Sequence, residues 1–242
     1  MWFRFALLGL AAAFALSPLR GEEPGQRETN PLRERIIALA RTVSAEDYAY
    51  TRTVRTEEIE QDKKETRTVI ERWDPARPVD QRWTLVSIDA RTPIAEEWKD
   101  YRKSLSKRRR AFYGRIAGYF AQSATSALDA KGRTVFRFAS LPKESVMVGD
   151  ADLSANASGE AIVNASGDVP FIEEVRFHSS GPTRVKLIAK IERFETITRY
   201  RMMPEGKPVP IELVSDMSGS MLGHEGRVRT RITYQDQRAV PK

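Results

Sequence analysis

Alternation of apolar and polar residues is the sequence feature that most constrains the fold. In the second half of the chain, apolar residues fall at every second position over segments near 171–178, 209–217 and 228–234. Neighbouring side chains of a strand point to opposite faces of a sheet, so this pattern predicts antiparallel strands with one face on a core and one in water. Segments near 48–58, 66–73, 82–89 and 133–139 have the same character. The chain is therefore predicted to be mostly antiparallel β.

Breaks in the alternation mark bends and turns. A slip of phase near Arg193 and Phe194 predicts a β-bulge or a bend. Asn-Ala-Ser-Gly occurs at 156–159 and again at 164–167, and both copies are interpreted as turns around a short strand at 160–163. The Gly-rich segment 218–224 is interpreted as a connection between two strands.

Two segments have helical rather than strand periodicity. Thr29 or Asn30 can cap a first helix in which Pro31 takes the first position and apolar residues follow at spacings of three and four. A second helical segment begins after Pro93, and its apolar stripe runs from Trp98 towards Phe120. A short helix in a β-rich chain usually lies across a sheet, which makes the predicted class α+β.

The N-terminus predicts export. Residues 1–16 carry an early Arg4 and then an apolar run, and Ala13-Phe14-Ala15 fits a cleavage site. We interpret residues 1–15 as a signal peptide, with a retained anchor as the alternative, and 16–29 as a disordered leader. Residues 30–238 are predicted to form a single domain. The chain has no cysteine, which favours a bacterial periplasm over a disulfide-forming compartment.

The net charge of +7 is concentrated in one place. Residues 99–115 hold eight bases and one acid, so this basic segment accounts for the whole excess. It is either a solvated helix face or a docking surface for an anionic membrane or an envelope protein, and nucleic acid is not an expected partner of an exported chain. The candidate anionic contacts are Lys107, Arg108, Arg109 and Arg110.

Catalytic patterns are poor. The two histidines, His178 and His224, lie on a polar strand face and in a turn, and no zinc-ligand spacing is present. Ser104 and Lys107 match a Ser-x-x-Lys pattern, but its companion motifs are absent. We therefore predict no enzyme, no metal and no cofactor.

Aromatic residues gather in the first hundred positions. They are either ordinary core or the lining of an apolar cavity between a curved sheet and the helices that cover it. The candidate cavity residues are Tyr48, Tyr50, Val54, Trp73, Trp83, Leu85, Trp98 and Tyr101.

The layout resembles a known group of proteins. The motif RWTLVSIDARTP, from Arg82 to Pro93, leads into an acidic and then basic helix, and the end runs from Pro208 to Tyr234-Gln235-Asp236. Together with the other segments this resembles an uncharacterised branch of the LolA-like, outer-membrane lipoprotein-sorting proteins of the periplasm. The resemblance implies a curved, open half-barrel sheet with an N-terminal helix and a mid-chain helical segment over its concave face. No lipid-handling residue of that group can be carried over to this sequence.

The resulting functional expectation is a non-enzymatic, periplasmic carrier or binding protein for an apolar ligand, either a lipid or a lipoprotein acyl chain. The alternative is an envelope scaffold or stress-sensing module that uses the basic segment as its docking surface.

Overall fold

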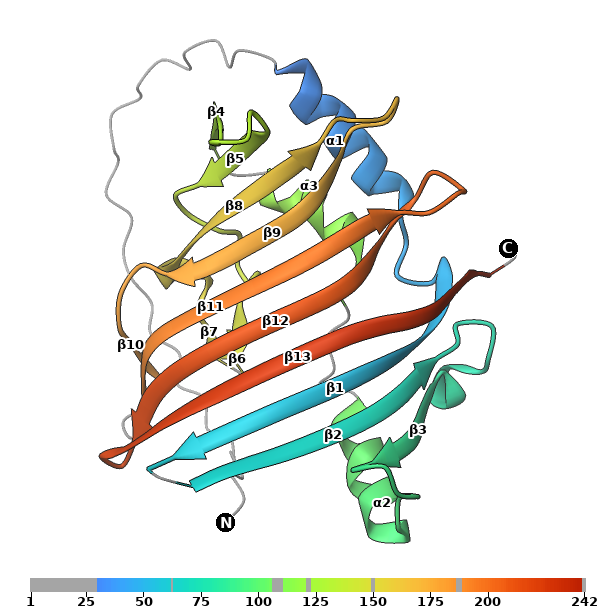
Figure 1. Ribbon diagram of the computed structural model, residues 1–242, viewed down its shortest axis with the longest axis vertical. Helices are drawn as coiled ribbons and strands as arrows, with labels where there is room; N and C mark the ends of the chain where they lie inside the picture. Colours follow the sequence, from blue (N-terminus) through green and yellow to red (C-terminus); the bar gives the residue numbers. More distant parts are fainter. Residues whose placement is uncertain are drawn as a thin grey trace, which may run out of the picture.

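One antiparallel sheet organises the protein, seen in a computed structural model that describes residues 30–61, 63–105, 111–120, 123–148, 151–185 and 189–240 (Figure 1). The strands of the sheet are β1 (Tyr48–Glu60), β2 (Lys63–Trp73), β3 (Trp83–Ile88), β4 (Ala124–Leu128), β5 (Thr134–Phe138), β8 (Ala157–Asn164), β9 (Phe171–Ser179), β10 (Thr183–Val185), β11 (Ala189–Met202), β12 (Pro208–Met221) and β13 (His224–Ala239). A separate pair, β6 (Met147–Val148) and β7 (Ala151–Asp152), forms a second small sheet.

Within these residues the large sheet has 11 strands in the order β3-β2-β1-β13-β12-β11-β9-β8-β5-β4, with β10 paired to β11. The described edge strands are β3 and β4, which lie at opposite ends of this order, so the sheet is open. The first and last strands pair side by side, with Tyr48 opposite Ala239. The predicted α+β class with an open antiparallel sheet is confirmed. The predicted signal peptide and leader lie outside the described residues.

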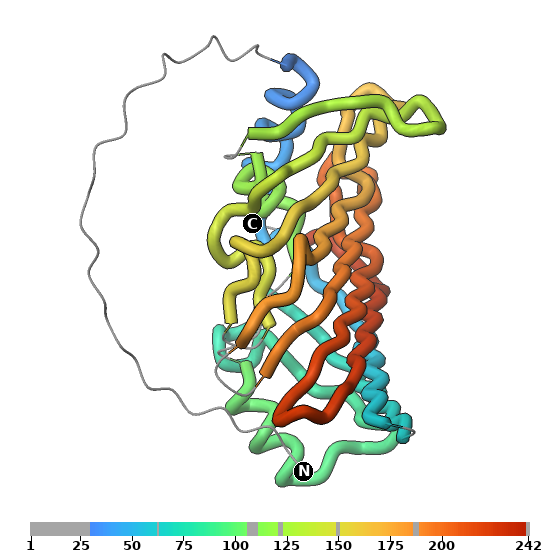
Figure 2. The backbone as a smooth tube through the Cα atoms, turned by 90° about the vertical axis from the view of Figure 1, so that its left-hand side faces the viewer, coloured from blue at the N-terminus to red at the C-terminus, as the bar shows by residue number. Residues whose placement is uncertain are grey.

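Helices cover one face of the sheet (Figure 2). They are α1 (Pro31–Thr42), α2 (Ala95–Ser104) and α3 (Ile116–Tyr119), with the 3-10 turns η1 (Val79–Gln81), η3 (Tyr113–Arg115) and η4 (Ser154–Asn156). We call the face that carries Tyr50, Phe136 and Tyr234 the covered face, and the face that carries Arg55 and Arg229 the open face.

The main core lies between α1, α3 and the covered face of the strands from β5 to β11. Asn30 caps α1 as predicted, because its side chain accepts hydrogen bonds from the backbone N–H groups of Leu32 and Arg33. The buried side of α1 packs with α3 against the sheet. This core includes Ile36, Ala40, Ile116, Phe120, Phe136, Phe138, Val175, Phe177 and Tyr200.

The other helix, α2, packs at the opposite end of the sheet, beside β3 (Figure 1). Its first turn is fixed by Glu97, whose carboxylate accepts a hydrogen bond from the Ile94 backbone N–H at 3.0 Å and ion-pairs with Arg91. The hydrogen bonds from Arg91 and then from Ile94 lower the pKa of Glu97 to about 2. This acid also lies where the helix dipole favours negative charge.

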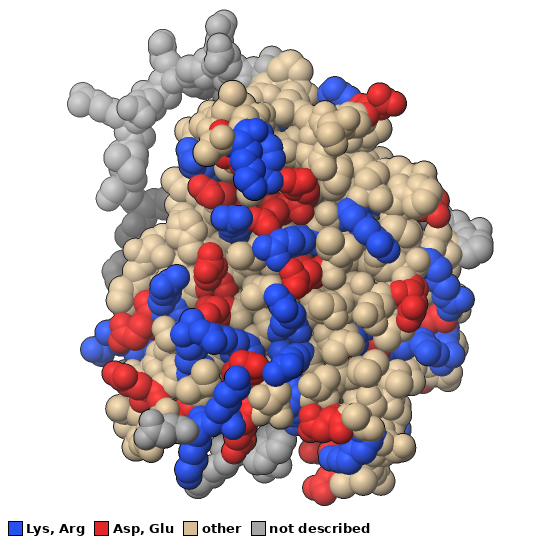
Figure 3. Space-filling view, viewed as in Figure 1, with Lys and Arg blue, Asp and Glu red and all other residues tan. Residues whose placement is uncertain are grey.

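The open face carries many charged side chains of both signs (Figure 3). They form cross-strand ion pairs over four adjacent strands. Arg199 contacts Glu174 and Glu212, and Asp216 contacts Arg227 and Arg229. This face is in contact with water, as the alternating pattern predicted, and its charged side chains pair across neighbouring strands.

Three local predictions can be compared with the strands. The bulge near Arg193 is confirmed, because the register of β11 and β12 shifts between Ile191 and Arg193. The first Asn-Ala-Ser-Gly is not a turn, since 157–159 form the start of β8. The segment 218–221 is not a connection either, because β12 runs to Met221 and the turn consists of Leu222 and Gly223, both at positive φ.

Candidate ligand-binding site

An aromatic cluster lies on the covered face where β1, β2, β3 and β13 meet. Tyr50 pairs with Trp73, and Trp73 pairs with Trp83, so the strand register places three predicted cavity residues side by side. The ring centroids of Trp73 and Trp83 are 5.2 Å apart, and those of Tyr50 and Tyr234 are 5.3 Å apart in a T-shaped arrangement. Trp83 is half-buried, and the other three are buried. Ala111 packs on the same cluster.

A second cluster joins α2 to β3. It is formed by Leu85, Ile88 and Tyr101, with Trp98 packed against it. The rings of Trp98 and Tyr101 are 5.9 Å apart. Trp83 touches both clusters, so six of the eight predicted cavity residues form two adjoining groups.

The remaining two predicted residues lie on either side of these groups along β1. Tyr48 is buried at the start of β1 and lines a small crevice with Tyr50. Burial, and then the nearby acids Glu205 and Asp47, raise the pKa of Tyr48 to about 12. Val54 is half-buried in the middle of β1, between Val69 and Ile232. That the eight residues line a ligand cavity stays a prediction.

A buried ion pair, which the sequence analysis missed, lies beneath the aromatic cluster. Arg52 Nε donates to Glu71 Oε2 at 2.7 Å, and the two side chains are 6 % and 1 % exposed. The Arg52 guanidinium carbon lies 4.2 Å from the centroid of the Trp83 ring, at stacking distance. Burial lowers the pKa of Arg52, but Glu71 and then Tyr234 more than offset this, so the pKa is raised overall. Arg52 remains a permanent buried cation.

This pair could have been found from strand parity. Tyr50, Arg52 and Val54 share one face of β1, and Trp73, Glu71 and Val69 share the facing positions of β2. The alternating pattern places Arg52 and Glu71 on the same buried face of neighbouring strands, where a base and an acid can form a cross-strand ion pair.

A row of half-buried apolar side chains follows the ion pair across the covered face. The row runs over β2, β1, β13 and β12, because the register aligns Val69 with Val54, Val54 with Ile232, and Ile232 with Leu213. All four are half-buried, whereas Val175 and Phe136, further along the same face under α1 and α3, are buried. We call these four residues the apolar row.

The next row of the same face is made of hydroxyl groups. Thr56 lies opposite Thr230, Thr230 opposite Ser215, and Ser215 opposite Thr196. Thr196 Oγ1 donates to Ser215 Oγ at 3.4 Å. The apolar row is therefore bounded by an ion pair on one side and hydroxyl groups on the other.

The predicted anionic contacts, Lys107 to Arg110, lie outside the described residues. Both described residues nearest to this stretch pack on the sheet. Leu105 packs on the cluster of Leu85, Ile88 and Tyr101, and Ala111 packs on the aromatic cluster. The chain thus leaves one cluster before this basic stretch and returns at the other.

Metal-binding side chains do not cluster in the part of the chain that the structure describes. No three His, Asp or Glu side chains there come together as a possible metal site. His178 and His224 are exposed, and His178 Nε2 lies 2.9 Å from Ser158 Oγ. None of the described helices is long and apolar enough to cross a membrane.

Comparisons with known proteins give fold-level likenesses only. No family model and no curated protein matches the chain. A LolA superfamily protein from Nitrosomonas europaea is 14 % identical, over 87 % of this chain and 94 % of that one, with a TM-score of 0.33. A DUF1329 family protein from Desulfovibrio piger is 10 % identical, with the same coverages and TM-score. An outer membrane lipoprotein-sorting protein domain from Vibrio parahaemolyticus is 12 % identical, over 86 % and 93 % of the two chains, also at 0.33.

The first and third names agree with the resemblance found in the sequence layout. At these identities and this TM-score, the likenesses say nothing about what this chain binds. Its role has to be argued from its own geometry.

Proposed function

We propose that this protein is a non-enzymatic carrier or binding protein for a lipid or a lipoprotein acyl chain in the bacterial envelope. The observation that carries the proposal is the apolar row, whose four side chains stay half-buried, whereas Val175 and Phe136 on the same face are buried under α1 and α3. Apolar surface left in contact with water costs about 25 cal/mol per Å², so an apolar ligand on this row is stabilised by removing it from water. Export through residues 1–15 to the periplasm is part of the proposal.

The shape of the row suits an extended chain of methylene groups. It crosses four neighbouring strands, which is about 14 Å at the usual spacing of about 4.8 Å between strands. An acyl chain lying across these strands would contact Val69, Val54, Ile232 and Leu213 in turn. The aromatic cluster packs against Ile232 of this row and supplies further apolar contact area.

The buried ion pair beside the row is not the proposed contact for a polar headgroup. Arg52 is held by Glu71 and stacked on Trp83, so it belongs to the protein's own packing rather than to a ligand. Lys107 to Arg110 enter the proposal as the contact for an anionic headgroup, because the residue that follows them, Ala111, packs on the aromatic cluster.

A test of this function uses Leu213→Gln and its matched control Val214→Gln. Both residues are half-buried neighbours on β12, but Leu213 is on the covered face and Val214 on the open face. Binding of a fluorescent fatty acid to the purified mature protein should weaken about tenfold in Leu213→Gln, since burying one leucine contributes about 1.5–3 kcal/mol. Val214→Gln should bind like the wild type.

Native mass spectrometry of freshly purified protein supplies the independent readout, and co-purified lipid is the expected result. The proposal fails if no lipid is carried and no probe is taken up. It also fails if the two glutamine variants, both folded by circular dichroism, lose affinity equally.

A further inference from the structure

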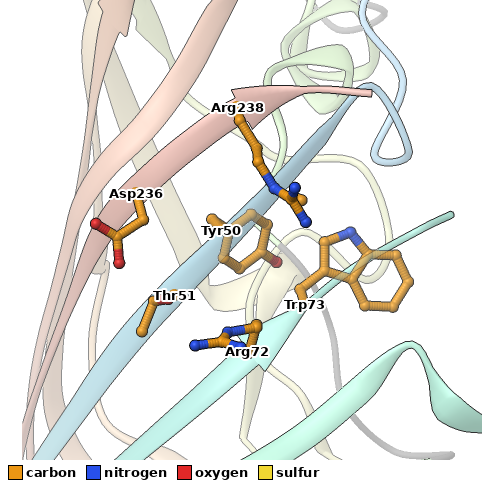
Figure 4. Close-up of a pocket in the computed structure, with 7 residues that line it drawn as sticks. Tyr50, Thr51, Arg72, Trp73, Asp236 and Arg238 are labelled. Atoms are coloured by element: carbon orange, nitrogen blue, oxygen red, sulfur yellow. The ribbon is translucent and has the colours of Figure 1, made fainter. Parts of the chain in front are cut away.

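A pocket of about 370 Å³ lies where the start of β1 runs between the ends of β2 and β13 (Figure 4). We call it the bulge pocket. The described residues that line it all belong to these three strands. The lining residues are Ala49, Tyr50, Thr51, Arg72, Trp73, Asp236 and Arg238.

The hollow follows from the sizes of the paired residues. Ala49 and Thr51 are small, and each lies opposite an arginine of a flanking strand, Arg238 on β13 and Arg72 on β2. Long side chains on both sides of a small pair leave a depression over the middle strand. In Figure 4 the guanidinium of Arg238 reaches towards Trp73, while Arg72 lies beside Thr51.

A β-bulge widens the hollow. The register of β1 and β13 shifts between Ala49 and Thr51, so that Tyr50 faces two residues of β13. One of these, Asp236, has a φ of 51°, in the left-handed region that Asn and Asp tolerate best among residues with a side chain. The bulge places a carboxylate at the edge of the pocket.

The arginines of the pocket keep most of their hydrogen-bonding capacity. Among the described residues Arg72 is exposed and forms no ion pair. The Arg238 side chain is 68 % exposed, and its one ion pair with a described residue joins Nη2 to Asp74 Oδ2 at 3.1 Å. Asp74 also pairs with Arg77. A guanidinium has five N–H donors, so both arginines can donate to a further anion.

We propose that the bulge pocket binds the phosphate group of a small phosphate ester. Both oxygens of a carboxylate accept hydrogen bonds from one guanidinium group in a bidentate pair. A tetrahedral phosphate has more acceptor oxygens, so it can accept hydrogen bonds from two guanidinium groups on different strands and from the Thr51 hydroxyl. Asp236 at the edge accepts a hydrogen bond from a hydroxyl or ammonium group of the same ligand. Ethanolamine phosphate and glycerol phosphate are of this class, either as free esters or as phospholipid headgroups.

This site shares Tyr50 and Trp73 with the aromatic cluster, but its proposed phosphate-binding groups lie apart from the apolar row. Arg72 and Thr51 face the open side of the sheet, opposite the apolar row, so either proposal can fail without the other.

The first measurement is ³¹P NMR line broadening of ethanolamine phosphate, glycerol 3-phosphate and inorganic phosphate on titration with the mature protein. Arg72→Gln should weaken ester binding about tenfold, the loss of one charge-assisted hydrogen bond. Arg137→Gln is the matched control, because it removes the same charge from an exposed position on β5. It should leave binding unchanged.

A second variant, Asp236→Asn, tests the assignment without threatening the fold, because asparagine tolerates the positive φ. It removes a negative charge from the pocket edge, so inorganic phosphate should bind more tightly. Ethanolamine phosphate should lose its advantage over inorganic phosphate.

Vesicles of phosphatidylethanolamine and phosphatidylglycerol distinguish the two sources of the phosphate. Binding of the free esters that depends on Arg72 assigns the pocket to soluble phosphate esters. Vesicle flotation that depends on Arg72, without binding of the free esters, assigns it to a lipid headgroup. The proposal is overturned if neither probe binds, if acetate binds as tightly as phosphate, or if Arg72→Gln and Arg137→Gln behave alike.

Discussion

At the scale of single residues, the buried pair of Arg52 and Glu71 is the least expected feature of the molecule. Taking two charges out of water carries a penalty that their mutual attraction offsets only in good geometry. The geometry here is good, with a 2.7 Å contact and an aromatic ring stacked over the guanidinium. Such a pair adds little net stability, yet either partner without the other would be a buried charge that lacks its counter-charge.

Replacing Arg52 alone should therefore be strongly destabilising. Arg52→Met leaves the Glu71 carboxylate buried without its cation, and the free energy of unfolding should fall by about 3–5 kcal/mol. The double variant Arg52→Met, Glu71→Leu should recover most of this loss. Urea denaturation followed by tryptophan fluorescence measures both.

The matched control is Arg55→Met on the same strand. Arg55 ion-pairs with Glu57 on the open face and is 57 % exposed, so its loss should change stability little. A double variant at Arg52 and Glu71 no more stable than Arg52→Met would contradict the account of a balanced pair.

The candidate site was predictable from the sequence to the extent that it follows strand parity. Tyr50, Trp73 and Trp83 were found because aromatic residues stand out in alternating segments, and the register brings them together. Arg52 was overlooked because charged residues are expected to face water. The bulge pocket could not be predicted, since it depends on how β13 pairs with β1, at opposite ends of the chain.

At the scale of elements, alternation identified most strands. Glycine and other small residues were interpreted as turns, although some of them lie within a strand, where they permit close packing. Gly219 is the clearest case, because it was interpreted as part of a connection and lies within β12. A Cβ atom at this position would come within 2.2 Å of the Lys190 carbonyl oxygen and 3.1 Å of the Ile191 Cα atom. Glycine here permits a close approach of two backbones beside the β11 bulge, and local sequence cannot reveal that contact.

Gly219→Ala should lower the free energy of unfolding by about 1–3 kcal/mol, the usual cost of forcing an extra methyl group into a packed contact. Gly167→Ala is the control, because a Cβ there meets no atom within 4 Å and φ is not positive. That variant should be neutral or slightly stabilised, since alanine restricts the unfolded chain. Thermal unfolding of both variants checks the contrast, and equal effects would mean that the β11–β12 contact yields without cost.

At the scale of the whole molecule, one sheet carries two unequal packing regions. The strands from β5 to β11 lie against α1 and α3 over the main core, while β1, β2, β3 and β13 carry the aromatic cluster and α2 packs on the small cluster beside β3. The half-buried apolar row runs from β2, within the second region, to β12, next to the β11 edge of the first. A continuous hydrogen-bonded sheet with uneven packing is expected to open locally where it has the fewest buried contacts, here at β3 and α2. Such local opening requires less free energy than global unfolding.

Hydrogen exchange should therefore divide the sheet along its width. Amides of β8 and β9, flanked by strands on both sides and backed by the main core, should exchange at least about a hundredfold more slowly than those of β3 and α2. β3 is an edge strand whose burial rests on three residues of a small cluster, so its opening exposes little apolar surface. Exchange followed by mass spectrometry of peptic fragments resolves these segments. Uniform protection from β3 to β8 would mean that the sheet opens only as one unit, and that the apolar row cannot admit a ligand by local opening of the α2–β3 end.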